Sequence, residues 1–224
     1  MDGDTLKRWR KEQRERLIRE RSGLDPVTLE GWRHRIDSFL ERSFPGLAGR
    51  RVAFCWPIRN EYDARHLART LREHGSLTAL PVVVAPRQPL VFREWHPGVE
   101  LAKGALDIPY PVGSREVVPE AVLLPMNGWD PKGYRLGYGA GFFDRTLASL
   151  AKRPVVIGTS TWSSGFPNGV AWPFDFSTPI TVNWMPRMRT ASPMIASGEL
   201  MPSVSSTVGP STATRWRPSS SVRE

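Results

Sequence analysis

Short apolar runs alternate with helical segments through the middle of the chain, and this alternation limits the possible folds more than any other feature. Five runs have the length and composition of buried strands, and they lie at residues 51–57, 80–85, 90–95, 121–125 and 154–158. Helical patterns are expected between them at residues 63–74 and 142–150. Strands that alternate with helices predict an α/β fold, Rossmann-like, with a mainly parallel sheet and helices on both faces.

Two further helices are expected before the first strand. Residues 5–21 form a highly charged helix with Asp4 or Thr5 as its predicted N-cap. Its apolar stripe is incomplete, so packing against other parts of the chain has to stabilise it. A second helix, from Asp25 or Thr28 to Phe44, has apolar residues at helical spacing and is predicted to pack on the core.

A glycine-rich segment separates the strand at residues 121–125 from the helix that begins at Phe142. Gly137, Gly139 and Gly141 allow positive φ angles and a close approach of the backbone to a ligand. The unpaired N–H groups at the start of the following helix attract anions. This position favours a phosphate site. The alternative is a flexible turn, because the glycine spacing matches neither the dinucleotide fingerprint nor the phosphate-binding P-loop.

Charged side chains close to these glycines support the phosphate interpretation. Arg135 and Arg145 flank the segment, and guanidinium groups can pair with phosphate oxygens. Asp144 adds a carboxylate, the ligand type of the magnesium ion that accompanies a nucleotide.

Composition indicates a globular protein of ordinary size. The chain has 224 residues, of which 40% are hydrophobic, enough to bury a core. No apolar stretch approaches the roughly 20 residues of a membrane span, and the charged first residues do not resemble a signal peptide. A cytoplasmic protein is expected. The single cysteine, Cys55, excludes an internal disulfide and is predicted to be an inert core thiol.

A net charge of +9 has two interpretations. It is compatible with a basic nucleic-acid-binding module. However, the basic residues near the N-terminus alternate with glutamates, as on a solvated helix face, and stacking aromatics are scarce among them. A cleft for a polyanionic small molecule explains the charge equally well. Nucleic acid is therefore not the expected partner.

Several segments together resemble the 5-formyltetrahydrofolate cyclo-ligases, also called methenyltetrahydrofolate synthetases. The most specific is the string Gly133-x-Arg135-Leu-Gly-Tyr-Gly-Ala-Gly-Phe-Phe-Asp-Arg145. Others are Glu61 in Asn-Glu-Tyr-Asp, the motif Phe92-Arg-x-Trp-x-Pro-Gly98, and Gly104-Ala-Leu-Asp-Ile-Pro-x-Pro111. The resemblance covers residues 6–158.

The resemblance implies an ATP-dependent enzyme. In this family ATP phosphorylates the formyl oxygen of 5-formyltetrahydrofolate, N10 attacks the activated carbon, and loss of phosphate leaves 5,10-methenyltetrahydrofolate and ADP. The implied ligands are ATP, Mg²⁺ and a reduced folate, and the expected form is a monomer. Phosphoryl transfer needs alignment and charge neutralisation more than a nucleophilic side chain.

The resemblance also implies roles for individual residues. On the N-terminal helix, Lys7 and Arg10 match a pair of family residues that contacts nucleotide phosphates. The usual separation in that pair is four residues and here it is three, so Arg14 is an alternative member of the pair. The expected nucleotide-binding segment comprises Arg135, Leu136, Gly137, Tyr138, Gly139, Ala140, Gly141, Phe142 and Phe143.

The remaining implied roles concern catalysis, folate and metal. Arg135 and Arg145 are the expected catalytic cations, and Asp144 is the expected metal ligand. The expected folate-binding residues are Trp56, Glu61, Tyr138 and Phe142. Two positions depart from the family pattern, since Tyr110 replaces a common glutamate and Phe143 a common tyrosine.

After Gly158 the resemblance ends. Of the 66 residues that follow, 29 are Ser, Thr or Pro, and the family's acidic closing motif is reduced to Asp175. We expect one domain over residues 1–183 and a disordered tail over 184–224. A shifted reading frame is our hypothesis for this segment; resequencing that finds no family-like motif in either other frame would reject it. The departure also predicts low activity, and a catalytically impaired folate- or nucleotide-binding protein is the alternative.

Overall fold

The computed structural model describes residues 2–129, 135–161 and 183–184. All of them belong to the compact unit Met1–Ala191; a second unit, Ser192–Glu224, lies outside the described residues. The predictions for Gly133, Asp175 and the tail beyond Trp184 therefore also lie outside them.

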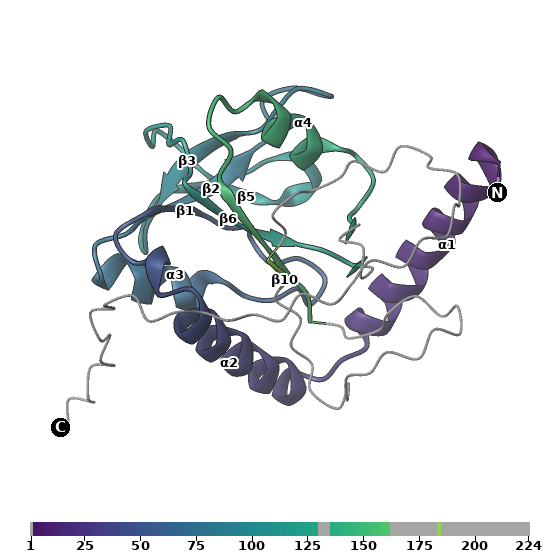
Figure 1. Cartoon of the computed structure of the whole chain (residues 1–224), viewed down its shortest axis with the longest axis horizontal. Coiled ribbons are helices and arrows are strands. Elements are labelled where there is room, and N and C mark those ends of the chain that lie inside the picture. The colour runs from purple at the N-terminus through teal and green to yellow at the C-terminus, as the bar shows by residue number, and fades with distance from the viewer. Residues whose placement is uncertain (1, 130–134, 162–182, 185–224) are drawn as a thin grey trace, which may run out of the picture. The chain divides into compact units, whose positions relative to one another are not determined.

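A six-stranded sheet forms the centre of the described structure (Figure 1), with the strand order β10-β9-β6-β1-β2-β3. The strands are β1 (Arg51–Ala53), β2 (Leu77–Val82), β3 (Val91–Trp95), β6 (Ala121–Pro125), β9 (Val155–Thr159) and β10 (Asn183–Trp184). The four inner strands are parallel, while β3 and β10 pair antiparallel at the two edges. The predicted α/β fold with a mainly parallel sheet is confirmed.

Alternation along the inner strands produces two cores. Because successive strand residues point to opposite faces, Leu123 packs with one cluster and Val122 with the other. Helices α2 (Pro26–Ser43) and α3 (Arg65–Glu73) contribute to the first cluster, and α4 (Phe142–Ser149) contributes to the second. Figure 1 shows α2 and α3 on one side of the sheet and α4 on the other. Both faces are covered, as a parallel sheet requires.

Helix α1 (Gly3–Ser22) is amphipathic only in part, as its sequence indicates. Leu17 and Arg21 are its buried residues. Its N-cap is Asp2, whose carboxylate accepts hydrogen bonds from the backbone N–H groups of Asp4 and Thr5. The predicted caps, Asp4 and Thr5, were wrong, because the helix begins two residues earlier than expected. No described helix has the length and apolar character needed to cross a membrane.

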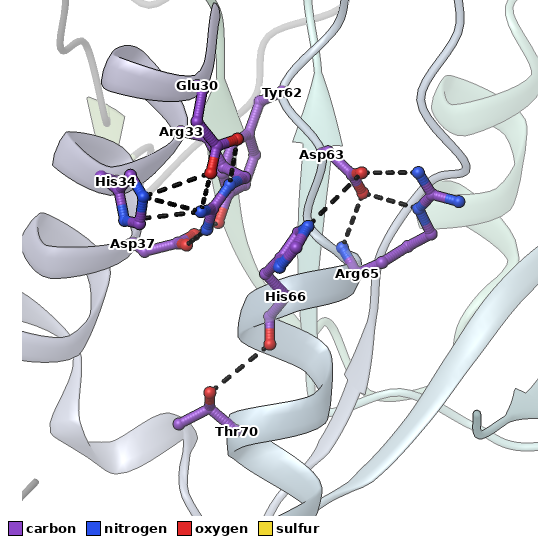
Figure 2. A network of polar contacts seen from close by, with 9 residues as sticks. All are labelled: Glu30, Arg33, His34, Asp37, Tyr62, Asp63, Arg65, His66 and Thr70. Carbon is purple, nitrogen blue, oxygen red and sulfur yellow. Dashed lines mark hydrogen bonds and ion pairs between the residues drawn. The ribbon is translucent and has the colours of Figure 1, made fainter. Parts of the chain in front are cut away.

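Helix α2 is joined to the segment before α3 by a polar network (Figure 2). The hydroxyl of Tyr62 donates to Asp37 of α2, and the Arg33 guanidinium donates to the same carboxyl group at 2.6 Å. Burial raises the pKa of Asp37, while its donors Tyr62 and Arg33 act in the opposite direction. The network fixes the chain immediately after Glu61.

Smaller elements complete the described structure. Strands β4 (Leu101–Lys103) and β5 (Pro109–Pro111) pair with each other, as do β7 (Gly128–Trp129) and β8 (Arg135–Leu136). Two 3₁₀ turns, η1 (Pro45–Leu47) and η2 (Ala105–Asp107), lie in the connections. The β7–β8 pair was not predicted, and it holds the start of the glycine-rich segment against the end of β6.

Candidate active site

A cavity of about 710 Å³ lies where three parallel strands end. Cys55 and Trp56 follow β1, Leu80 to Val83 include the end of β2, and Pro125 closes β6. Ligands of open α/β sheets bind at these carboxyl ends. The glycine-rich segment and the start of α4 form another wall, from Arg135 to Asp144.

The glycines of this wall are required by their conformation and by close contacts. Gly139 has φ +95°, and a Cβ built on it would lie 3.0 Å from the guanidinium carbon of Arg14. Gly141 has φ +68° and is the N-cap of α4. Among the described residues, no side chain caps this helix. Its first N–H groups are therefore available to an anion in the cavity.

Two arginines of α1 reach the cavity beside these glycines. Arg14 donates from Nε to the carbonyl oxygen of Gly137 at 2.8 Å, and Arg10 also lines the cavity. Burial, and then the charge of Arg10, lower the pKa of Arg14 from its ordinary value. In the part of the chain that the structure describes, neither arginine pairs with a carboxylate. Their uncompensated charge suits a polyanionic ligand.

Lys7 is placed differently from the expectation based on the resemblance. It is not among the described residues that line the cavity, its side chain is 79% exposed, and its ammonium group lies 3.1 Å from the carboxylate of Asp4. Arg10 and Arg14 are four residues apart, which is the spacing stated for the family's phosphate-binding pair. The structure thus brings Arg10 and Arg14, rather than Lys7 and Arg10, to the glycine-rich wall.

The two arginines expected to act in catalysis have different environments. Arg135 lines the cavity and forms an ion pair with Asp144, the expected metal ligand. Arg145 does not line the cavity in the described structure: its Nη2 donates to the carbonyl oxygen of Ala140 at 2.8 Å, and its guanidinium lies 5.2 Å from the ring centre of Phe142. Arg145 therefore stabilises the glycine-rich loop from outside the cavity.

A second wall of the cavity, around Glu61 and Trp56, adjoins the glycine-rich wall, and the buried carboxylate of Glu61 accepts two hydrogen bonds. The hydroxyl of Tyr138 donates to Oε1 at 2.9 Å, and the N–H of Ile58 donates to Oε2 at 3.1 Å. Burial raises the pKa of Glu61, while the positive charge of Arg21 opposes this shift. Burial, and next the charge of Glu61, raise the pKa of Tyr138 to about 12. Because both residues line the cavity, Glu61 can accept further hydrogen bonds from a ligand.

Aromatic and apolar side chains form the rest of this region. Trp56 lines the cavity, and the guanidinium of Arg65 lies 4.6 Å from its ring centre, which fixes the indole. Phe142 and Phe143, expected in the nucleotide-binding segment, also line the cavity. So does Tyr110, at the position that departs from the family pattern. Flat apolar walls near a carboxylate suit a bicyclic heteroaromatic ring such as a pterin.

Three features were missed or misjudged from the sequence. Cys55 was expected to be an inert core thiol; it lines the cavity and is only partly buried, so the core position was wrong, while the pKa of the thiol, raised well above its ordinary value by its surroundings, agrees with low reactivity. Arg21, deeply buried at the end of α1, was read as part of a solvated face. Ile58 contributes its backbone N–H, for which a side-chain pattern carries no signal.

The residues described here offer little for a metal ion. They contain no group of three or more His, Cys, Asp or Glu side chains that could hold one. Asp144 is the carboxylate within the glycine-rich wall, and it already pairs with Arg135. Magnesium that accompanies nucleotides is often held by one or two carboxylates together with phosphates and water. Asp144 thus fits as a single ligand and not as a complete site.

Comparisons with known proteins agree with this geometry. The family model described as the 5-formyltetrahydrofolate cyclo-ligase family matches residues 7–161. A 5-formyltetrahydrofolate cyclo-ligase of Mycolicibacterium smegmatis is 32% identical over 158 residues, which cover 67% of this chain and 80% of that protein. One from Escherichia coli is 33% identical over 109 residues, covering 46% of this chain and 60% of that protein.

Solved structures show the same fold. A 5,10-methenyltetrahydrofolate synthetase of Aquifex aeolicus has a TM-score of 0.62 at 22% identity, over 82% of this chain and 96% of the other. One from Mycoplasma pneumoniae has a TM-score of 0.54 at 19% identity, over 66% of this chain and 83% of the other. With the family match extending over most of the described residues, the chain belongs to the 5-formyltetrahydrofolate cyclo-ligase family.

Proposed function

We propose that this chain catalyses the ATP-dependent cyclisation of 5-formyltetrahydrofolate to 5,10-methenyltetrahydrofolate. The observation that carries the proposal is a single cavity with two chemically different walls. One wall has glycine backbone, a helix N-terminus, and Arg10 and Arg14, for which the described residues supply no carboxylate partner; the other has the buried carboxylate of Glu61 beside the indole of Trp56. Family membership supports this assignment, because the named relatives are cyclo-ligases.

The glycine-rich wall is the proposed ATP site. Arg10 and Arg14 would neutralise phosphate oxygens, and the amides from Gly137 to Gly141 would donate hydrogen bonds to them. Arg135 lies on the same wall and can move its charge from Asp144 to the transferred phosphoryl group. Arg145 acts through the loop, whose Ala140 carbonyl it holds.

The wall around Glu61 and Trp56 is the proposed site of the reduced folate. Glu61, with both oxygens already accepting hydrogen bonds, can accept others from N–H donors of a reduced pterin. The indole of Trp56, fixed by Arg65, and the ring of Phe142 from the adjoining glycine-rich wall offer apolar surface for the pterin. The hydrogen bond from Tyr138 to Glu61 joins this wall to the glycine-rich wall, so a folate bound here would lie next to the proposed ATP site.

The proposed reaction proceeds in two steps and needs no nucleophilic side chain. First, the formyl oxygen bonds to the γ-phosphorus of ATP while the bond to the bridging oxygen breaks and releases ADP, and the N5 lone pair forms a double bond to the formyl carbon. Then N10 attacks that carbon, its proton leaves, and the carbon–oxygen bond breaks to release phosphate. The protein aligns the reactants and neutralises the moving charge through Arg10, Arg14 and Arg135.

A magnesium ion would supply further charge neutralisation, with Asp144 as its protein ligand. The ion pair with Arg135 makes this ligand partly unavailable. We expect Asp144→Asn to raise the Mg²⁺ concentration needed for half-maximal activity. The folate affinity measured without nucleotide should stay unchanged.

The experiment is a spectroscopic assay of the purified chain. The methenyl product absorbs where 5-formyltetrahydrofolate does not, so enzyme in excess over folate should give product only when ATP is present. Glu61→Gln should lose folate affinity, and Arg14→Ala should lose ATP affinity. Binding of both ligands without product would instead support the catalytically impaired alternative.

A further inference from the structure

Arg21 is buried although it does not line the cavity in the described structure. Only 2% of its side chain is exposed. Arginine is rarely buried unless its donors are satisfied. Here Nε donates to the carbonyl oxygen of Arg59 at 2.8 Å, and Nη2 donates to the hydroxyl oxygen of Tyr138 at 2.7 Å. Nη2 also lies 3.8 Å from Oε1 of Glu61.

These contacts fix the direction of a hydrogen-bond chain. A guanidinium has donors and no acceptor, so the Tyr138 oxygen has to accept from Arg21. The single hydroxyl proton is then left for Oε1 of Glu61, at 2.9 Å. Since Oε2 of Glu61 accepts from the N–H of Ile58, both oxygens act as acceptors. This pattern fits an ionised carboxylate.

Arg21 also holds the loop that carries Glu61. Arg59 and Asn60 have φ angles of 49° and 60°, a region that non-glycine residues occupy only at an energetic cost. The Arg21 side chain binds the carbonyl of Arg59, and Nδ2 of Asn60 donates to the backbone oxygen of Arg21 at 3.2 Å. The strained loop is thus held from both sides by one residue of α1.

We propose that Arg21 is a positioning residue for the folate wall of the cavity: from outside the cavity, it directs the Tyr138 hydroxyl toward Glu61 and keeps that carboxylate an acceptor for the ligand. This inference rests on the proposed function for the identity of the ligand. It assigns to the end of α1 a role separate from that of Arg10 and Arg14 on the nucleotide wall.

The positive charge of Arg21 affects the pKa of Glu61, and this effect can be measured. The groups that face Glu61 are Arg21 from α1, Arg59 from its own loop, Tyr138 from the glycine-rich segment and Cys55 from the end of β1. Burial raises the pKa of Glu61, and Arg21 provides the largest opposing contribution. Loss of the Arg21 charge should raise this pKa further, so folate binding that requires the ionised carboxylate should fail at a higher pH than in the wild type.

The test compares Arg21→Gln, Arg21→Lys and Tyr138→Phe with the wild type. The control Arg19→Gln removes the same charge from an exposed position of the same helix. Two quantities are measured from pH 5 to 8: the affinity for 5-formyltetrahydrofolate, and the ¹³C shift of the Glu61 carboxyl in the ligand-free protein, assigned with Glu61→Gln. The second does not depend on any ligand.

We expect Arg21→Gln to bind the folate about tenfold or more weakly at pH 7, as for loss of a charged hydrogen-bond partner. In Arg21→Gln the Glu61 titration should move to higher pH, and ATP affinity should be retained. In Arg21→Lys, which keeps the positive charge, the titration should move less. If Arg21→Gln does not fold, Tyr138→Phe should still show the upward shift.

Identical Glu61 titrations in the wild type and the folded variants would overturn the inference, as would an equal shift in Arg19→Gln. A wild-type chain that binds no 5-formyltetrahydrofolate would contradict the proposed function instead. In that case the carboxyl titration still decides whether Arg21 positions Glu61.

Discussion

Arg10 and Arg14 are the residues on which the nucleotide assignment most depends. They line the cavity from α1 beside the glycine-rich segment, and burial, followed by the charge of Arg10, lowers the pKa of Arg14. Bringing two cations together costs free energy unless an anion joins them. The pair is therefore better explained by a bound polyanion than by stability.

The first prediction separates this pair from Lys7. Arg14→Ala should weaken ATP binding about tenfold or more, because a charge-assisted hydrogen bond contributes roughly 1.5–3 kcal/mol. Lys7→Ala should have a small effect, since its side chain is exposed and paired with Asp4. Calorimetric titration with ATP measures both, and Lys11→Ala, another exposed lysine on α1, is the control. A larger loss in Lys7→Ala than in Arg14→Ala would reverse the assignment.

The second prediction concerns Gly139. An alanine there would combine a strained φ of +95° with a Cβ 3.0 Å from the Arg14 guanidinium. Gly98 has a similar φ of +84°, and its Cβ would meet nothing within 4 Å. Both alanine variants should lose about 1 kcal/mol of stability from the backbone strain, but only Gly139→Ala should lose ATP affinity. Equal ATP affinities in the two folded variants would show that the segment does not approach the nucleotide.

At the scale of elements, the polar network of Figure 2 connects helix α2 to the segment that follows Glu61. The Tyr62 hydroxyl is a donor to the buried Asp37 carboxyl, which Arg33 also contacts. Such a network stabilises the fold only while each buried acceptor keeps its donors.

The third prediction is that Tyr62→Phe destabilises the protein by about 1–3 kcal/mol, with more loss at high pH than at low pH. In the folded wild type, burial already raises the pKa of Asp37, and the Tyr62 donor opposes that shift. Without the donor the folded-state pKa rises further, so the folded variant gives up its proton less readily than the unfolded chain. The stability that the protonated Asp37 contributes is fully present below the pKa of Asp37 in the unfolded chain. It is lost as the pH rises through the pKa of Asp37 in the folded variant.

Urea unfolding at pH 4 and pH 8 tests this prediction. Asp37→Asn, which cannot titrate at this position, is the matched background, and in it the effect of Tyr62→Phe should no longer vary with pH. A loss in the single variant that is the same at both pH values would show that the Asp37 charge is not involved.

Elements with strong local patterns could be predicted from the sequence, and those defined by distant contacts could not. The strand Ala121–Pro125 and the start of α4 at Phe142 have the expected bounds. The β7–β8 pair was missed because two-residue strands have no periodicity. Arg21 was missed for a related reason: its burial depends on Arg59 and Tyr138, which are distant in sequence.

At the scale of the whole molecule, the family match ends at residue 161, well before the end of the 224-residue chain. The described part of the following segment includes β10, in which Trp184 pairs with Ile157 of β9. This pairing crosses the boundary expected at residue 183. Residues 185–224 lie outside the described structure, and their composition is rich in Ser, Thr and Pro.

The fourth prediction is that a chain ending at Trp184 has the melting temperature of the full-length chain. Ordering a residue costs about 1–2 kcal/mol of conformational entropy, and the sequence after Trp184 has no periodic apolar pattern to offset that cost. A chain ending at Arg153 is the contrasting control, because it lacks β9 and should not fold cooperatively. Thermal denaturation tests this prediction. A melting temperature many degrees lower in the chain ending at Trp184 than in the full-length chain would assign the tail a structural role.

The central claim is that one cavity brings ATP and 5-formyltetrahydrofolate together, and single-turnover formation of the methenyl product tests it most directly. With enzyme in excess, we predict product that requires ATP and that is lost in Arg14→Ala and Glu61→Gln. With folate in excess, turnover should be slower than about 1 per second, because Asp144 is shared with Arg135 and the family resemblance ends after Gly158. Faster turnover would show that the departure after Gly158 costs no activity. An absence of ATP-dependent product from the folded wild-type chain would contradict the claim.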